Sequence, residues 1–243
     1  MKYKKRTFII ACRTNIVINL FKVLVKGDII MGIFKKLCMT SMLGVMLTVP
    51  TYATVVTGSQ SDVNLDLKYP LVYTDHAYAQ RVINTDIANY VLEAKDMYYN
   101  QHIYQVSQNY KVTYEDSQVV SILLITYYYY AGAAHGMYNT RGLVYNKVTG
   151  QRIPLYNYIK IANAAQLDNG LRSHVLSYYT GNHTKSYIPS GWSVKYVTDN
   201  YCLRGKGNID LVYQPYELGP YAAGNTYIGF TPKAIEYFNR MNS

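Results

Sequence analysis

Twelve residues near the middle of the chain read Val119-Val-Ser-Ile-Leu-Leu-Ile-Thr-Tyr-Tyr-Tyr-Tyr130. Apolar side chains occupy both sets of alternating positions here, whereas a strand with one solvated face alternates apolar and polar residues. A strand that is apolar on both sides is typical of the interior of a sheet that is covered on both faces. We therefore predict a central strand at residues 118–130 and arrange the rest of the fold around it.

Shorter stretches on either side predict the other elements of the domain. Alternating apolar residues indicate strands at 63–73, 106–114, 136–146, 209–216 and 226–230. Apolar residues spaced by three and four indicate helices at 76–104 and 164–179, and Pro232 is placed to begin a short final helix at 233–241. Strands and helices do not alternate regularly. The sequence therefore predicts an α+β fold, with a mostly antiparallel sheet, two main helices and a short C-terminal helix.

The first 53 residues have the pattern of a leader rather than of a folded domain. Lys35 and Lys36 precede an apolar run at 37–49, and small residues lead to Ala53, which is the order of a secretory signal peptide. The run is shorter than the about 20 apolar residues that a spanning helix needs. We expect cleavage after Ala53 and an extracytoplasmic location; an uncleaved N-terminal anchor is the alternative. The pattern restarts at Met31, which is a candidate true start, with residues 1–30 an extension.

The leader also explains the basic charge of the chain. Nine of the 24 basic residues but only one of the 14 acidic residues lie before Thr54, which leaves residues 54–243 with 15 basic and 13 acidic residues, a formal net charge of +2. The isoelectric point of about 9.3 is therefore no sign of nucleic-acid binding, which requires a basic face. After cleavage we expect no contact with a membrane, and the sequence does not define an oligomeric state.

Two features of composition bear on residues 54–243. Small and polar residues predict a flexible start at 54–62. Cys202 is the single cysteine after the leader, so no internal disulfide can form, and we expect a buried, inert thiol. Of the 29 tyrosines, all but Tyr3 and Tyr52 belong to this part of the chain. Tyrosine packs an apolar ring while keeping a hydroxyl for a partner, and it is enriched at binding surfaces.

Two motifs are more specific than any periodicity. The first is Tyr130-Ala-Gly-Ala-Ala-His-Gly136, followed by Thr149-Gly150, and the second is Tyr213-Gln-Pro-Tyr-Glu-Leu-Gly-Pro-Tyr-Ala-Ala-Gly224. Together they resemble the RsiV-type domain family, also known as DUF3298. The upstream segment, with Tyr69-Pro70 and Ile83-Asn84, resembles the DUF4163 segment that often precedes it. The resemblance implies a DUF4163-like part at 63–130 and a DUF3298-like part at 131–243, packed as a single unit.

The resemblance implies a function outside the cell membrane. Family members form the outer domain of RsiV-type anti-sigma factors and part of PdaC-type peptidoglycan deacetylases. Residues 1–30 are too short for a sigma-factor-binding domain and no deacetylase domain follows Ser243, so we expect neither activity here. The remaining expectation is a non-enzymatic module that binds cell-wall glycan (peptidoglycan) or a lysozyme-type protein. The alternatives are a glycan-modifying enzyme or its accessory domain, and a structural envelope protein.

The second motif supplies the candidate binding residues. Its prolines stiffen the segment, so aromatic side chains can be presented at little entropic cost. The candidates are Tyr213, Tyr216, Glu217, Pro220 and Tyr221, with Trp192 as a second anchor. Alternatively, the segment is a rigid crossover that buries Tyr221. The remaining motif residues are assigned to structure: Tyr130, Gly132, His135, Gly136, Gly150 and Gly224.

The chemistry-bearing residues do not predict an enzyme. His135 lies between two glycines and either braces the turn or serves as a ligand or catalytic group. The five histidines show no i, i+4 pair, so no metal site is expected. No Gly-x-Ser-x-Gly nucleophile motif is present, although a Ser–His–Asp triad assembled from distant residues remains open. We expect no cofactor.

Overall fold

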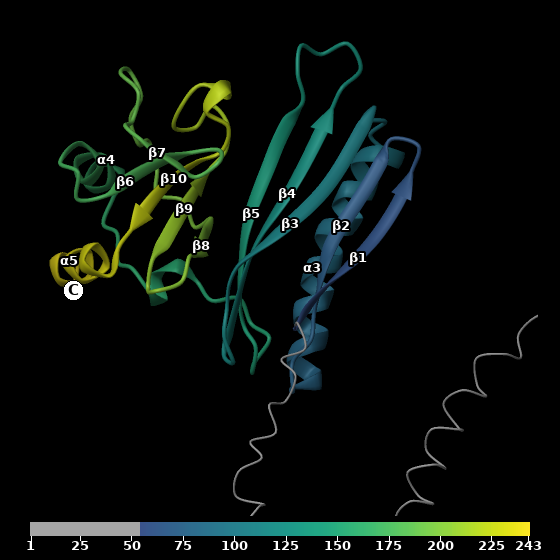
Figure 1. Ribbon diagram of the computed structural model, residues 1–243, viewed down its shortest axis with the longest axis horizontal. Helices are drawn as coiled ribbons and strands as arrows, with labels where there is room; N and C mark the ends of the chain where they lie inside the picture. The colour runs from purple at the N-terminus through teal and green to yellow at the C-terminus, as the bar shows by residue number, and fades with distance from the viewer. Residues whose placement is uncertain (1–53) are drawn as a thin grey trace, which may run out of the picture. The chain divides into compact units, whose positions relative to one another are not determined.

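The computed structural model describes residues 54–243. The first of its two sheets contains the predicted central strand (Figure 1). Its five strands have the order β1-β2-β3-β4-β5, and only β2 and β3 are parallel neighbours. The strands are β1 (Val55–Asp62), β2 (Leu65–Val72), β3 (Gln105–Glu115), β4 (Val119–Tyr129) and β5 (Met137–Asn146). β4 lies between β3 and β5, and most of its first half is buried. The predicted leader and its cleavage site lie outside the described residues.

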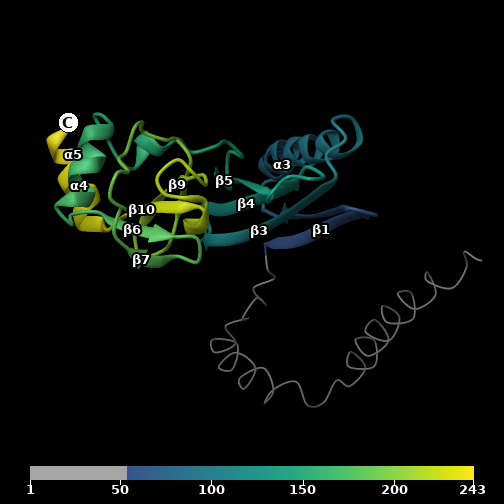
Figure 2. The ribbon, with the colours of Figure 1, turned by 90° about the horizontal axis from the view of Figure 1, so that it is seen from above.

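One face of the first sheet is covered by helix α3 (Ala77–Tyr99), which connects β2 to the parallel strand β3 (Figure 2). The buried side chains of α3 recur at three- and four-residue steps, as the sequence predicted: Ala79, Ile83, Ile87, Val91 and Ala94. All of them except Ala79 belong to buried clusters with apolar residues of β2, β3, β4 and β5. Burial of each large aliphatic side chain contributes about 1.5–3 kcal/mol, so this layer fixes α3 on the sheet.

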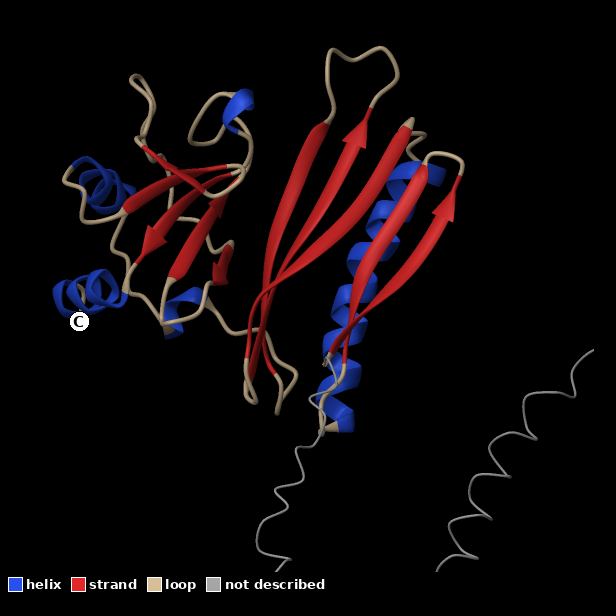
Figure 3. Ribbon diagram, in the orientation of Figure 1, coloured by secondary structure: helices blue, strands red, loops and turns tan. Residues whose placement is uncertain are grey.

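The second sheet has the order β7-β6-β10-β9-β8, and all its neighbouring strands are antiparallel (Figure 3). Its strands are β6 (Ser177–Thr180), β7 (Thr184–Ser186), β8 (Tyr201–Leu203), β9 (Ile209–Tyr213) and β10 (Thr226–Phe230). The helical elements that accompany it are η1 (Leu155–Asn157), α4 (Ala164–Arg172), η2 (Tyr221–Ala223) and α5 (Pro232–Met241). α4 and α5 pack on this sheet through Leu167, Leu171 and Phe238, which belong to one buried cluster.

The two sheets meet at β5, where β8 approaches so closely that a Cβ at Gly142 would overlap the Tyr201 backbone. Two amide side chains complete the joint. The Gly142 N–H donates to Asn200 Oδ1 (2.6 Å), and the Thr140 N–H donates to Gln214 Oε1 (2.8 Å). Both amides also donate to the Thr140 carbonyl, at 2.8 and 2.7 Å. Asn200 and Gln214, here called the amide clamp, thereby satisfy backbone groups of β5 that no neighbouring strand pairs.

The predicted fold class, α+β with mostly antiparallel strands, two main helices and a short C-terminal helix, is confirmed, and the strands form two sheets. The helix predicted at 164–179 ends at Arg172, because His174 has a positive φ of 59° and Ser177–Thr180 pair with β10 as β6. The flexible start predicted at 54–62 is instead strand β1, since β2 offers a partner to all eight of its residues.

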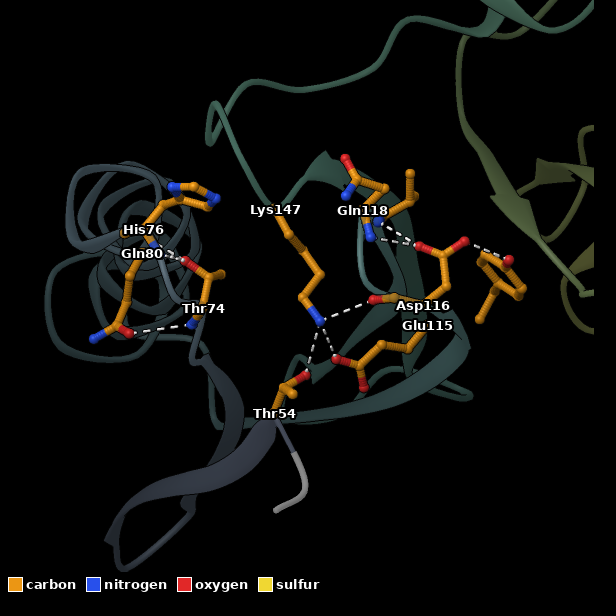
Figure 4. Close-up of polar contacts among 10 residues, drawn as sticks. Thr54, Thr74, His76, Gln80, Glu115, Asp116, Gln118 and Lys147 are labelled. Atoms are coloured by element: carbon orange, nitrogen blue, oxygen red, sulfur yellow. Dashed lines mark hydrogen bonds and ion pairs between the residues drawn. The ribbon is translucent and has the colours of Figure 1, made fainter. Parts of the chain in front are cut away.

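Lys147 is buried just after β5, and its ammonium group contacts Thr54 and the turn between β3 and β4 (Figure 4). Lys147 Nζ donates to Glu115 Oε1 and to the Asp116 carbonyl, both at 2.9 Å, and to Thr54 Oγ1 at 3.3 Å. A buried ammonium group is tolerated only when such partners replace its water. The contact joins the β3–β4 turn to the residue that follows the predicted cleavage site.

Candidate functional site

The first and second motifs meet in space around His135, although they lie about eighty residues apart in the chain. The His135 ring stacks on Tyr221 with ring centres 3.8 Å apart and planes inclined by 22°. His135 Nε2 lies 3.2 Å from the Tyr216 hydroxyl. The Tyr221 hydroxyl donates to the Gly136 carbonyl at 2.7 Å. The loop between β4 and β5 is thus fastened to the segment between β9 and β10.

The tautomer of His135 follows from its two partners. His135 Nδ1 lies 3.0 Å from the Gly136 carbonyl, which can only accept a hydrogen bond. Nδ1 therefore carries the hydrogen, and in the neutral ring Nε2 accepts from the Tyr216 hydroxyl. The predicted role of His135 as a brace for the turn agrees with this geometry, and the brace extends to the second motif as well.

The backbone of the second motif is shaped to present Tyr216. Tyr216 has a φ of 71°, a left-handed conformation that is costly for a residue with a large side chain. Glu217 Oε2 accepts from the Gln214 N–H at 2.6 Å and closes the turn from inside. Pro220 precedes η2, and Gly224 ends it with a φ of 63°. The result is a short turn that leaves Tyr216 50% exposed beside His135.

Two further tyrosines extend the aromatic surface. Tyr127 at the end of β4 and Tyr138 at the start of β5 have ring centres 5.1 Å apart. A Cβ at Gly136 would overlap the Tyr127 ring, so glycine lets the loop lie against it. The pKa of Tyr221 is raised, first by burial and then by the nearby hydroxyls of Tyr138, Tyr127 and Tyr216. We call His135, Tyr127, Tyr138, Tyr216 and Tyr221 the tyrosine–histidine cluster.

Comparisons with known proteins show a fold that this chain shares with others. Residues 57–138 match the family model described as Deacetylase PdaC. A crystal structure of a DUF3298 family protein from Pseudomonas aeruginosa PAO1 superposes with a TM-score of 0.52 at 12% identity, covering 75% of this chain and 91% of that one. A second, from Bacteroides fragilis NCTC 9343, gives 0.51 at 15% identity, covering 77% and 94%. The chain has the DUF3298-type fold. No curated protein matches it.

Within the DUF3298-type domain, the predicted binding residues do not all lie at one surface. Tyr213 is 1% exposed, and its hydroxyl donates to the Tyr196 carbonyl at 3.0 Å, so it is a core residue. Glu217 is half-buried and serves the turn, whereas Pro220 is exposed at the start of η2. Trp192 forms no hydrogen bond or ring pair with the tyrosine–histidine cluster; its carbonyl accepts from Arg172, on α4.

The remaining motif residues take structural positions. Gly132 and Gly150 have φ angles of 83° and 79°, which side chains rarely adopt. Tyr130 is exposed at the end of the central stretch and lies edge-on to Tyr128. Cys202 is buried as predicted, and burial raises the pKa of its thiol to about 12, so little reactive thiolate forms near neutral pH.

A buried ion cluster in the second sheet was not predicted from the sequence. His183 Nε2 lies 2.7 Å from Asp210 Oδ2, and Arg204 Nε lies 3.4 Å from the same oxygen. The Asp210 side chain is 4% exposed, and burial raises its pKa although His183 and Arg204 oppose the shift. Among residues 54–243, no hydrogen bond joins His183 to a serine, threonine or cysteine side chain. The sequence carries no local signal for this cluster, because His183 and Asp210 lie 27 residues apart and meet only in the folded sheet.

The described residues contain no group of three or more histidine, cysteine or carboxylate side chains placed to hold a metal ion. None of the helices at 54–243 is both long enough and apolar enough to cross a membrane.

Proposed function

We propose that this DUF3298-type domain is an exported, non-enzymatic module that binds cell-wall glycan, and that the tyrosine–histidine cluster is its binding surface. The observation that carries the proposal is the meeting of both sequence motifs in one exposed aromatic group, with His135 fastened between Tyr216 and Tyr221. Aromatic faces pack on the apolar faces of sugar rings, and their hydroxyls offer hydrogen bonds at the ring edges. The leader pattern at residues 1–53 supports export.

The arrangement favours binding over catalysis. Glycoside hydrolysis uses a pair of carboxylates flanking the bond that breaks. No carboxylate belongs to the tyrosine–histidine cluster, and Glu217, adjacent to Tyr216, already accepts from the Gln214 N–H. His135 holds a carbonyl with one nitrogen and a tyrosine hydroxyl with the other. Both ring nitrogens are therefore occupied in the domain itself.

A glycan is favoured over a lysozyme-type protein by charge. Lysozymes are strongly cationic, and residues 54–243 carry a formal net charge of +2, which provides no long-range attraction between the two. A glycan that binds through the faces of its sugar rings needs no such steering. The aromatic cluster supplies short-range contacts that act equally well at any net charge.

The experiment is a calorimetric titration of residues 54–243 with soluble peptidoglycan fragments and with lysozyme. Tyr216→Ala should weaken glycan binding by about 2 kcal/mol, which is roughly thirtyfold in Kd. The matched control is Tyr156→Ala, since Tyr156 is 72% exposed on η1, away from the cluster. Equal effects of the two variants, or binding to lysozyme but to no glycan fragment, would reject the proposal.

A further inference from the structure

A hollow lies beside the second sheet, and none of the residues of the tyrosine–histidine cluster borders it. It is a hollow of about 490 Å³ between the end of α4 and strand β7. Its floor contains the buried residues Leu171, Leu176 and Tyr178. No residue of the tyrosine–histidine cluster lines it, so occupancy of the two sites can be tested separately.

The charged residues that line this hollow are all basic. Arg172, His174 and Lys185 line it, and no aspartate or glutamate does. Arg172 forms an ion pair with Asp168, with 2.7 Å between Arg172 Nε and Asp168 Oδ2. Lys185 has neither an ion pair nor a side-chain hydrogen bond within residues 54–243. An unpaired lysine among the lining residues of a hollow that has no acid on its lining favours an anionic ligand.

The hollow also offers an aromatic wall and unused hydrogen-bonding groups. Tyr187 is 75% exposed and meets the edge of His174, with ring centres 5.5 Å apart. Within the described chain, the side chains of His174, Ser177, Ser186 and Tyr187 make no hydrogen bond to other residues. His174 is held at a φ of 59°, a backbone conformation that places its ring beside Tyr187 instead of continuing α4. Such convergence of polar groups over an apolar floor is characteristic of small-ligand sites.

We propose that this hollow binds a sugar that carries a carboxylate or phosphate group. The anion lies near Lys185 and His174, where an ammonium and a ring N–H can both donate to it. The sugar ring packs against Tyr187 and takes a hydrogen bond from the hydroxyl of Ser186, which shares a sheet face with Tyr178. Carboxylate and phosphate share the chemistry that this lining recognises, and the test distinguishes them.

The test uses three matched probes on the full chain: glucose, glucuronate and glucose 6-phosphate, titrated by calorimetry at low salt. Glucuronate, glucose 6-phosphate or both should bind, and glucose should not. Lys185→Gln should weaken the binding anion by about fivefold, the value of one solvent-exposed charge pair at contact distance. The matched control is Lys233→Gln, which removes the same charge from an exposed position on α5 outside the hollow.

A second variant, His174→Asn, tests the histidine while keeping a residue that tolerates a positive φ. It should weaken the same ligand without lowering the melting temperature. Tyr216→Ala, in the tyrosine–histidine cluster, should leave anion binding unchanged. Three outcomes would overturn the proposal: glucose binding as tightly as the anions, no binding of any probe, or equal weakening by Lys185→Gln and Lys233→Gln.

Discussion

The amide clamp makes a prediction in which two substitutions act together. Asn200→Ala leaves the buried Gly142 N–H without its acceptor, while the Thr140 carbonyl keeps the amide of Gln214. Gln214→Ala leaves the Thr140 N–H without an acceptor, while the same carbonyl keeps Asn200. Each single variant therefore leaves one buried N–H donor without an acceptor, which lowers the free energy of unfolding by about 1–3 kcal/mol.

The double variant should cost more than the sum of the single variants. It leaves both the Gly142 N–H and the Thr140 N–H without an acceptor, and it also removes both side-chain donors to the Thr140 carbonyl. We expect the double variant to lose about 1 kcal/mol more unfolding free energy than the two single variants together, which is the net value of one hydrogen bond. Urea unfolding followed by circular dichroism gives the four free energies of the cycle. Asn182→Ala, at an exposed turn position between β6 and β7, is the control and should change stability little.

The clamp also bears on the candidate site, because Gln214 lies two residues before Tyr216 and Thr140 lies on β5 beyond the His135 loop. If the clamp aligns the two motifs, Gln214→Ala should weaken glycan binding more than Asn200→Ala at equal loss of stability. A double variant that loses no more free energy than the sum, or single variants that each lose under about 0.5 kcal/mol, would refute the reasoning.

Two further predictions rest on local geometry, and a third rests on the leader pattern of the sequence. Gly136→Ala should destabilise the domain by about 1–3 kcal/mol in urea unfolding, because the new Cβ overlaps the Tyr127 ring. Burial opposes ionisation of Asp116, but hydrogen bonds from the Tyr114 hydroxyl and two backbone N–H groups lower its pKa on balance. The stabilising contribution of ionised Asp116 should therefore be fully present above the unfolded pKa of about 4, and it should be lost as the pH falls through the lower folded pKa. In Asp116→Asn, the free energy of unfolding should vary less with pH over that acid range, as measured by urea unfolding. N-terminal sequencing of the exported protein should begin at or near Thr54, and recovery of an intact, membrane-anchored N-terminus would contradict cleavage.

The spacing of apolar residues was sufficient to predict the elements whose structure follows from their own local sequence. The central strand was predicted because its residues are apolar on both faces, and α3 because its apolar residues recur at three- and four-residue steps. The start of α5 was predicted from Pro232. The helix at 164–179 was predicted too long because its apolar spacing continues beyond Arg172, where pairing with β10 prevails over local helix preference. Strand β1 was missed for the opposite reason: its polar residues carry no pattern, and only β2 makes it a strand.

The candidate site shows where local reasoning stops. The two motifs were recognised separately, yet nothing in either one states that His135 stacks on Tyr221 and meets Tyr216, because that contact depends on how the two sheets join. The join in turn depends on Gly142, whose missing side chain admits β8, and on the amide clamp, whose two members are unremarkable polar residues in the sequence. Tyr213 and Tyr216, three residues apart in the same motif, have opposite fates: one lies in the core and the other is presented to solvent by a turn with positive φ. A tyrosine-rich segment therefore predicts an aromatic surface, while the sheet joint decides which of its tyrosines are exposed there.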